Sequence, residues 1–285
     1  MNGFRERRYT AQDGLSLYFR DYGDPDSAVT PILCLPGLTR NSKDFHDVAL
    51  RLSARRRVIC PDYRGRGKSE YDADAKSYQP SVYLNDIRHL LAVAGIGRVI
   101  VFGTSLGGIL AMAMGAAMPT TLAGVLLNDV GPQIATDGLG RIMDYIGKDR
   151  PHADWDSAIA DFKLMFPSVT LGNDVEWLAA AQATWRLGDD GALHFDWDVR
   201  LAETLRNAPP VPDLWPLFHS LDCVPMLAVR GALSDVLTEK TFDKMARARS
   251  GILRVTVPET GHVPTLSEPI VQDEMDAFLT MYAEP

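Results

Sequence analysis

The sequence predicts an α/β fold, with a mostly parallel, doubly wound β-sheet between helices and a helical insertion before the next-to-last strand. Short, almost uninterrupted apolar runs alternate with segments that carry apolar residues at helical spacing. This alternation stops once, between residues 132 and 215. The composition of the 285 residues, 46% hydrophobic and 23% charged, is that of a globular chain with a large core.

The N-terminal segment predicts an antiparallel hairpin. Residues 15–23, LSLYFRDYG, alternate apolar and polar side chains as a half-buried strand does. Residues 7–14, RRYTAQDG, precede them and end in a turn signal, Asp-Gly. We therefore expect the two segments to pair before the parallel part of the sheet begins.

Six later runs predict strands that are buried on both faces, because each is nearly continuous in apolar residues and ends in glycine, proline or a polar residue. They are residues 31–37, 56–67, 98–105, 124–132, 225–231 and 252–262. Five segments between or after these runs predict amphipathic helices, several of which open on a capping Ser or Asn. They are residues 41–54, 81–95, 105–118, 239–250 and 267–282.

The interruption predicts a helical cap. Residues 132–215 end in a proline cluster at 208–216 and carry helical patterns without a convincing buried strand. The core domain is then 1–131 together with 216–285. All five tryptophans fall in or beside the cap, and Trp155, Trp177 and Trp185 are candidates for the roof of an apolar pocket. The alternative is that they attach the cap to the sheet domain.

Net charge and composition restrict the partners. A formal charge of −8 disfavours a nucleic-acid surface, which needs Lys and Arg to neutralise phosphates. The N-terminus has no apolar stretch of signal-peptide length, and no later run is long enough to span a membrane. The three cysteines lie within or beside apolar runs, which is typical of reduced thiols in a protein core. We expect a cytoplasmic protein with a small-molecule substrate, and the sequence does not determine its oligomeric state.

The segment Gly103-Thr104-Ser105-Leu106-Gly107 predicts an exposed, activated serine. It lies between a buried strand and a small-residue helix, where a sharp turn projects the serine above the sheet. The helix then runs close behind the strand, so the residues two before and two after Ser105 must be small. The Leu106 N–H, at the start of the helix, is placed to receive an oxyanion.

Activation of Ser105 requires a base, and His262 is the best placed of the six histidines. It follows the last buried strand in a loop, at the edge where the sites of open α/β sheets gather. Two aspartates compete to orient it. Asp235, in the glycine-containing loop after the next-to-last strand, is our preferred acid, and Asp129, after the strand before the cap, is the alternative.

At this point the chain resembles the α/β-hydrolase superfamily over nearly its whole length. Besides the nucleophile elbow, residues 62–69, DYRGRGKS, resemble the Asp-x-Arg-Gly-x-Gly-x-Ser turn of that family, and residues 267–279 resemble its closing helix. The resemblance implies a second oxyanion donor in the loop after the first parallel strand. That donor is the Leu38 N–H by position, although Pro36 stands where the family usually has histidine. Nearby Arg40 is a candidate to bind a polar substrate group, or else a solvated residue.

These observations predict a cofactor-independent serine hydrolase without a metal, which cleaves a small carboxylic ester or lactone through an acyl-enzyme on Ser105. The resemblance leaves three alternatives. A carbon–carbon bond hydrolase and a perhydrolase of the haloperoxidase type share the triad, although Val263 stands where the carbon–carbon enzymes often have tryptophan. A ligand-binding receptor or signalling module on the same fold is the alternative of another class. The natural substrate and the mobility of the cap are not determined by the sequence.

Overall fold

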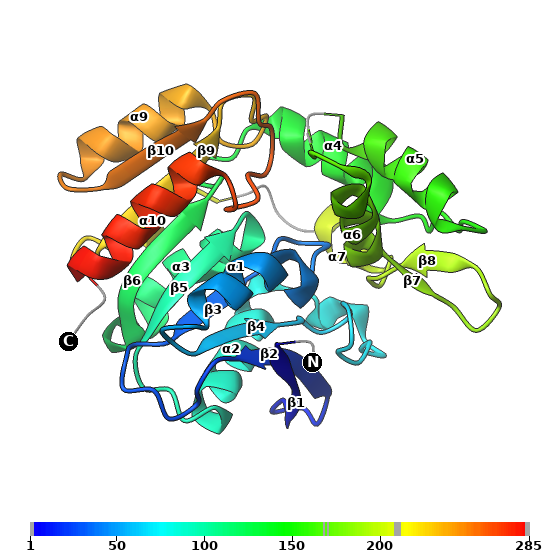
Figure 1. Cartoon of the computed structure of the whole chain (residues 1–285), viewed down its shortest axis with the longest axis horizontal. Coiled ribbons are helices and arrows are strands. Elements are labelled where there is room, and N and C mark those ends of the chain that lie inside the picture. Colours follow the sequence, from blue (N-terminus) through cyan, green and yellow to red (C-terminus); the bar gives the residue numbers. More distant parts are fainter. Residues whose placement is uncertain (1–2, 168, 170, 208–211, 283–285) are drawn as a thin grey trace.

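In the computed structural model, eight strands of the described residues form one sheet in the order β1-β2-β4-β3-β5-β6-β9-β10 (Figure 1). The structure describes residues 3–167, 169, 171–207 and 212–282. β1 and β2 pair antiparallel, β2 is antiparallel to β4, and the other neighbours are parallel. The strands are β1 (Phe4–Thr10), β2 (Ser16–Tyr22), β3 (Ile32–Leu35), β4 (Val58–Pro61), β5 (Val99–Thr104), β6 (Leu122–Asn128), β9 (Met226–Gly231) and β10 (Leu253–Val257). The predicted fold class, including the N-terminal hairpin, is confirmed.

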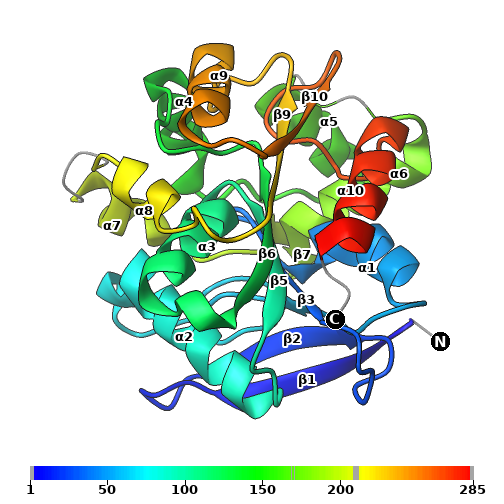
Figure 2. The same cartoon turned by 90° about the vertical axis from the view of Figure 1, so that its left-hand side faces the viewer.

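Helices cover both faces of the sheet, and Figure 2 shows the two layers on either side of it. α1 and α10 pack on one face, and α2, α3, α8 and α9 pack on the other. Strand residues alternate between these layers, so that Leu33 faces one hydrophobic core and Cys34 faces the other. The helices are α1 (His46–Leu52), α2 (Pro80–Val93), α3 (Leu106–Ala117), α8 (Trp215–His219), α9 (Glu239–Ala248) and α10 (Pro269–Tyr282). The short 3-10 helices of the described residues are η1 (Ser42–Phe45), η2 (Ala75–Ser77) and η3 (Pro119–Thr121).

Residues 132–215, called the insertion below, separate β6 from β9 in sequence. They form α4 (Thr136–Ile146), α5 (Trp155–Met165), α6 (Asp174–Thr184) and α7 (Leu201–Arg206). The sequence predicts no convincing buried strand here, and the structure adds a short antiparallel hairpin in which β7 (Trp185–Leu187), with two of its three residues exposed, pairs with β8 (Leu193–Phe195). Each strand has three residues, too few for an alternating pattern to be recognised. Part of the predicted proline cluster, 208–211, lies outside the described residues.

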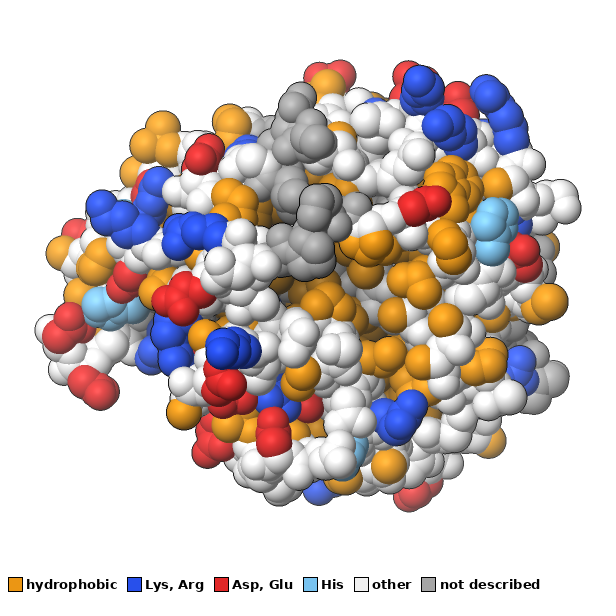
Figure 3. Space-filling model, turned by 180° about the vertical axis from the view of Figure 1, so that it is seen from behind, with side chains coloured by type: hydrophobic (Ala, Val, Ile, Leu, Met, Phe, Trp, Pro, Cys, Tyr) orange, Lys and Arg blue, Asp and Glu red, His pale blue; other side chains and the backbone are white. Residues whose placement is uncertain are grey.

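Two further expectations need correction. β10 is an edge strand and is buried only at alternate residues, Val255 and Val257, because only one of its faces is covered. Cys34 and Cys60 are core thiols as expected, but Cys223 is exposed. Figure 3 shows positive and negative side chains interspersed over one face of the molecule. Within the described ranges, no helix combines the length and the apolar character needed to cross a membrane.

Candidate active site

The turn between β5 and α3 carries Ser105 in a left-handed backbone conformation, with φ of 51°. This region is sterically costly for a residue other than glycine. A Cβ atom on Gly103 would lie 2.5 Å from the Gly107 carbonyl oxygen, and one on Gly107 would lie 2.0 Å from the Leu35 carbonyl oxygen. The sequence thus permits this tight turn because both positions lack a side chain.

Three side chains from distant parts of the chain meet at the carboxyl edge of the sheet. His262, in the loop after β10, has its Nε2 3.1 Å from the Ser105 Oγ. Its Nδ1 lies 2.6 Å from the Asp129 Oδ2. The side chain of Asp129 is fully buried and that of His262 is 10% exposed. The three groups form a continuous hydrogen-bonded series from carboxylate to imidazole to hydroxyl.

Asp129 is held in place by the loop that follows β9. Its Oδ1 accepts a hydrogen bond from the Gly231 N–H at 2.9 Å, and its Oδ2 accepts one from the Ser234 hydroxyl at 2.6 Å. A buried carboxylate requires such donors to offset the loss of water. Ser234 is a site residue that sequence reasoning missed, because a serine in a polar loop carries no distinguishing signal.

The expected contact between Asp235 and His262 is wrong. Asp235 instead binds Arg141 of α4 through two hydrogen bonds, of 2.8 and 3.0 Å. The hydrogen bonds from Arg141 hold the pKa of Asp235 below its ordinary value. Asp129 follows β6 directly, whereas Asp235 lies four residues beyond the end of β9 and is carried towards the insertion.

The two expected oxyanion donors belong to segments that adjoin Ser105, because Leu106 follows it directly and the loop with Leu38 lies beside it. A Cβ atom on Gly37 would lie 3.8 Å from the Ser105 Cβ, so the loop that contains Leu38 is adjacent to the serine. Among the described residues, the Leu38 and Leu106 N–H groups have no hydrogen-bond partner. Leu106 is the first residue of α3, whose leading N–H groups have no carbonyl within the helix.

The four predicted pocket residues have other contacts. Arg40 binds Asp44 through Nε and Nη2, at 2.7 and 2.6 Å, and donates to the Thr184 hydroxyl through Nη1 at 2.6 Å. Trp185 is 1% exposed, and its Nε1 donates to the Arg150 carbonyl. Trp155 and Trp177 are half-buried and pack against the larger hydrophobic core. The Arg40 Cγ lies beside Gly37, which also adjoins Ser105, and the role of these four residues in a pocket stays a prediction.

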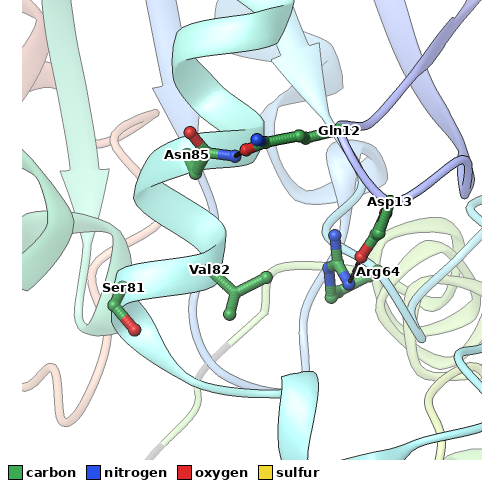
Figure 4. A pocket seen from close by; sticks show the side chains of 6 residues that line it. All are labelled: Gln12, Asp13, Arg64, Ser81, Val82 and Asn85. Carbon is green, nitrogen blue, oxygen red and sulfur yellow. Dashed lines mark hydrogen bonds and ion pairs between the residues drawn. The ribbon is translucent and has the colours of Figure 1, made fainter.

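A surface pocket of about 310 Å³ lies between the β1–β2 turn and the start of α2. Figure 4 shows Asn85 pointing towards Gln12 and Arg64 towards Asp13, with hydrogen bonds of 2.9 and 2.7 Å. Ser81 and Val82 complete the lining. None of the predicted site residues contributes to it, so this pocket is not part of the Ser105 cluster.

Comparisons with known proteins agree with this architecture. The model of the alpha/beta hydrolase family matches residues 32–272. A 3-hydroxybutyrate-oligomer hydrolase of Cupriavidus necator is 34% identical over 262 residues, which is 88% of each chain. A 2-(acetamidomethylene)succinate hydrolase of Mesorhizobium japonicum is 26% identical over 81% of each chain. The crystal structure of an alpha/beta hydrolase from Novosphingobium aromaticivorans superposes with a TM-score of 0.92 at 42% identity, covering 98% of this chain and 99% of that one.

Proposed function

Since the chain belongs to the alpha/beta hydrolase family, we propose that it is a serine hydrolase of small carboxylic esters or lactones, with Ser105, His262 and Asp129 as its triad. The observation that carries the proposal is the series of contacts from the Asp129 carboxylate through His262 to the Ser105 hydroxyl. An isolated serine hydroxyl is a weak nucleophile, and this arrangement supplies the base that it needs.

The geometry supports a two-step reaction. His262 Nε2 accepts the Ser105 proton as Oγ attacks the carbonyl carbon, and later returns a proton to the leaving alkoxide. Asp129 keeps a proton on Nδ1, which leaves Nε2 as the acceptor, and stabilises the imidazolium. Water then attacks the acyl-enzyme. His262 accepts a proton from this water and passes it to the Ser105 oxygen as the acid leaves. The Leu38 and Leu106 N–H groups donate to the oxyanion in both steps.

The names of the relatives suggest a narrower substrate class. The Cupriavidus protein is named for oligomers of 3-hydroxybutyrate, which are linear carboxylic esters, and it matches 88% of this chain. We therefore include esters of short hydroxy acids in the proposed range. The second relative, at 26% identity, is named for a succinate derivative. Both named substrates carry a free carboxylate.

The test combines turnover with labelling. We expect the wild type to hydrolyse p-nitrophenyl esters of short acids, a 3-hydroxybutyrate dimer or small lactones, and Ser105→Ala to lose this activity. A fluorophosphonate should label Ser105 stoichiometrically by mass spectrometry. Ser53→Ala is the matched control, because the Ser53 hydroxyl donates to the Leu50 carbonyl of its own helix region, and this variant should behave as wild type. Absence of Ser105-dependent turnover on all these substrates by a folded wild type would reject the proposal.

A further inference from the structure

In the loop after β3, the carbonyl groups of residues 36–38 accept hydrogen bonds from different parts of the chain. Three successive carbonyl oxygens each accept one hydrogen bond, while the Leu38 N–H between them stays free within the described part of the chain. The Tyr63 hydroxyl donates to Pro36 at 3.2 Å, the Arg40 N–H to Gly37 at 3.2 Å, and the Arg66 Nε to Leu38 at 2.9 Å.

The donor to the Leu38 carbonyl is a fully buried guanidinium. Arg66 has no exposed surface, and its Nη1 donates to the Arg64 carbonyl at 2.7 Å and to the Tyr83 hydroxyl at 2.8 Å. Tyrosine rings surround it, at 5.8, 5.6 and 4.8 Å from its Cζ for Tyr63, Tyr78 and Tyr83. The tyrosine rings and the carbonyls hold the guanidinium plane in one orientation.

The charge of Arg66 is not balanced by a carboxylate. Among the described residues it has no ion-pair partner, whereas neighbouring Arg64 contacts Asp13, Asp72 and Asp86. The Arg66 Nη2 is buried and has no hydrogen-bond partner. An unpaired charge and an unsatisfied donor both cost stability in a protein interior, so their retention calls for an explanation.

The unsatisfied nitrogen lies on the same edge of the guanidinium as Nε. In Arg64 these two nitrogens, Nε and Nη2, bind the two carboxylate oxygens of Asp86 at 2.8 Å each. The corresponding edge of Arg66 therefore faces the Leu38 carbonyl with one donor used and one free. This places an uncompensated positive charge directly behind the loop that carries the Leu38 N–H.

We propose that Arg66 is a positioning residue of the oxyanion hole, which holds the Leu38–Thr39 peptide and supplies a buried positive charge that favours the developing oxyanion. The inference rests on the proposed serine-hydrolase function. Hydrogen bonds fix the peptides on both sides of Leu38, one at the Gly37 carbonyl and the other, from Arg66, at the Leu38 carbonyl. The Leu38 N–H is therefore already oriented, and no reorganisation energy is needed during the reaction. The charge acts in a water-poor environment, where electrostatic effects are large.

The experiment compares two inhibitors in Arg66→Gln and wild type. A trifluoromethyl ketone adds the Ser105 hydroxyl and forms a hemiketal oxyanion, whereas the matching methyl ketone binds mainly without that charge. We expect the preference for the fluorinated ketone and kcat to fall together by about 10-fold to 100-fold, with KM changed less than about threefold. Arg66→Lys keeps the charge but lacks the planar fork, and should lose less.

Arg249→Gln is the matched control. Arg249 is a buried arginine that donates to the Leu221 and Val224 carbonyls. These carbonyls precede the amino end of β9, whereas Ser105 follows the carboxyl end of the parallel strand β5. Its replacement should lower stability without changing the inhibitor preference. An unchanged preference in Arg66→Gln, or in Arg66→Lys if the glutamine variant does not fold, would overturn the inference. An equal fall in Arg249→Gln would also overturn it. A wild type without Ser105-dependent hydrolysis would instead reject the proposed function.

Discussion

Ser105 and Asp129 share an unusual backbone conformation. Their φ angles are 51° and 54°, and both residues stand directly after parallel strands that are neighbours in the sheet. Conformations of this kind cost free energy and persist where the surrounding structure determines them. Here the Ser105 N–H donates to the Asn128 carbonyl, and the Asp129 N–H donates to the Val229 carbonyl. The sheet itself thus holds both side chains above its carboxyl edge.

Replacement of the two competing aspartates separates their roles. Asp129→Asn should lower kcat by roughly 10³-fold to 10⁴-fold, because an amide cannot hold the His262 tautomer that accepts the serine proton. Asp235→Asn should stay within about tenfold of wild type, since this residue contacts Arg141. Ester hydrolysis under saturating substrate, with circular dichroism as the check on folding, measures both effects. The reverse order of the two losses would restore Asp235 as the acid.

At the scale of elements, a histidine joins the short hairpin of the insertion to the segment after α4. His194 of β8 lies 2.6 Å from Asp149 through Nδ1 and 3.1 Å from Asp190 through Nε2. These two hydrogen-bonded carboxylates raise the pKa of His194 above its ordinary value of 6.5. The Phe195 N–H also donates to Asp149, so one carboxylate holds two successive residues of the strand.

The raised pKa makes the stability of the insertion depend on pH. Because the folded state binds the proton of His194 more tightly than the unfolded state, its stabilising contribution is complete below the ordinary pKa of 6.5. The contribution disappears as pH rises through the folded pKa. The difference in melting temperature between wild type and His194→Gln should therefore be larger near about pH 5.5 than near about pH 8.5. A difference that stays constant across this range would show that protonation is not involved.

At the scale of the whole molecule, the loop after β3 joins the sheet to the insertion. Asn41 is fully buried, and its Nδ2 donates to the Ala183 carbonyl at 3.1 Å and to Asp196 at 3.2 Å. The Lys43 Nζ also reaches Asp196, at 2.7 Å. The end of α6 is thus attached to the same loop that carries Leu38, so the packing of the insertion and the geometry of this loop are coupled.

Removal of this attachment should be costly. Asn41→Ala leaves the Ala183 carbonyl and an Asp196 oxygen without this donor, and should lower the free energy of unfolding by about 1 to 3 kcal/mol. Asn85→Ala is the control, because Asn85 bonds to Gln12 at the surface, and its change should stay within about 0.5 kcal/mol. Urea unfolding followed by fluorescence measures both variants. Equal effects would mean that the buried amide does not hold the insertion.

Local patterns were sufficient for most of the sheet and for its longer helices, but not for the short helix α8. The apolar runs at β3, β4, β5, β6 and β9 are buried throughout, as strands between two helical layers must be. The same reasoning fails at β10, because the run does not reveal whether both faces of its strand are covered. It also fails for β7 and β8, which are stabilised by a tertiary aromatic cluster that includes the stacked rings of Phe195 and Trp197, 3.9 Å apart.

The sequence by itself determined the α/β architecture, the elbow around Ser105 and the position of His262 in the loop after the last strand, since each depends on local sterics or on position relative to a strand. Only the tertiary structure shows which of Asp129 and Asp235 contacts His262. Both follow strands that end at one edge of the sheet, and both preserve the chain order of serine, acid and histidine. The difference lies in the distance of each aspartate from the end of its strand, which is one residue for Asp129 and four residues for Asp235. Asp129 stays beside His262, whereas the turn after β9 delivers Asp235 to Arg141.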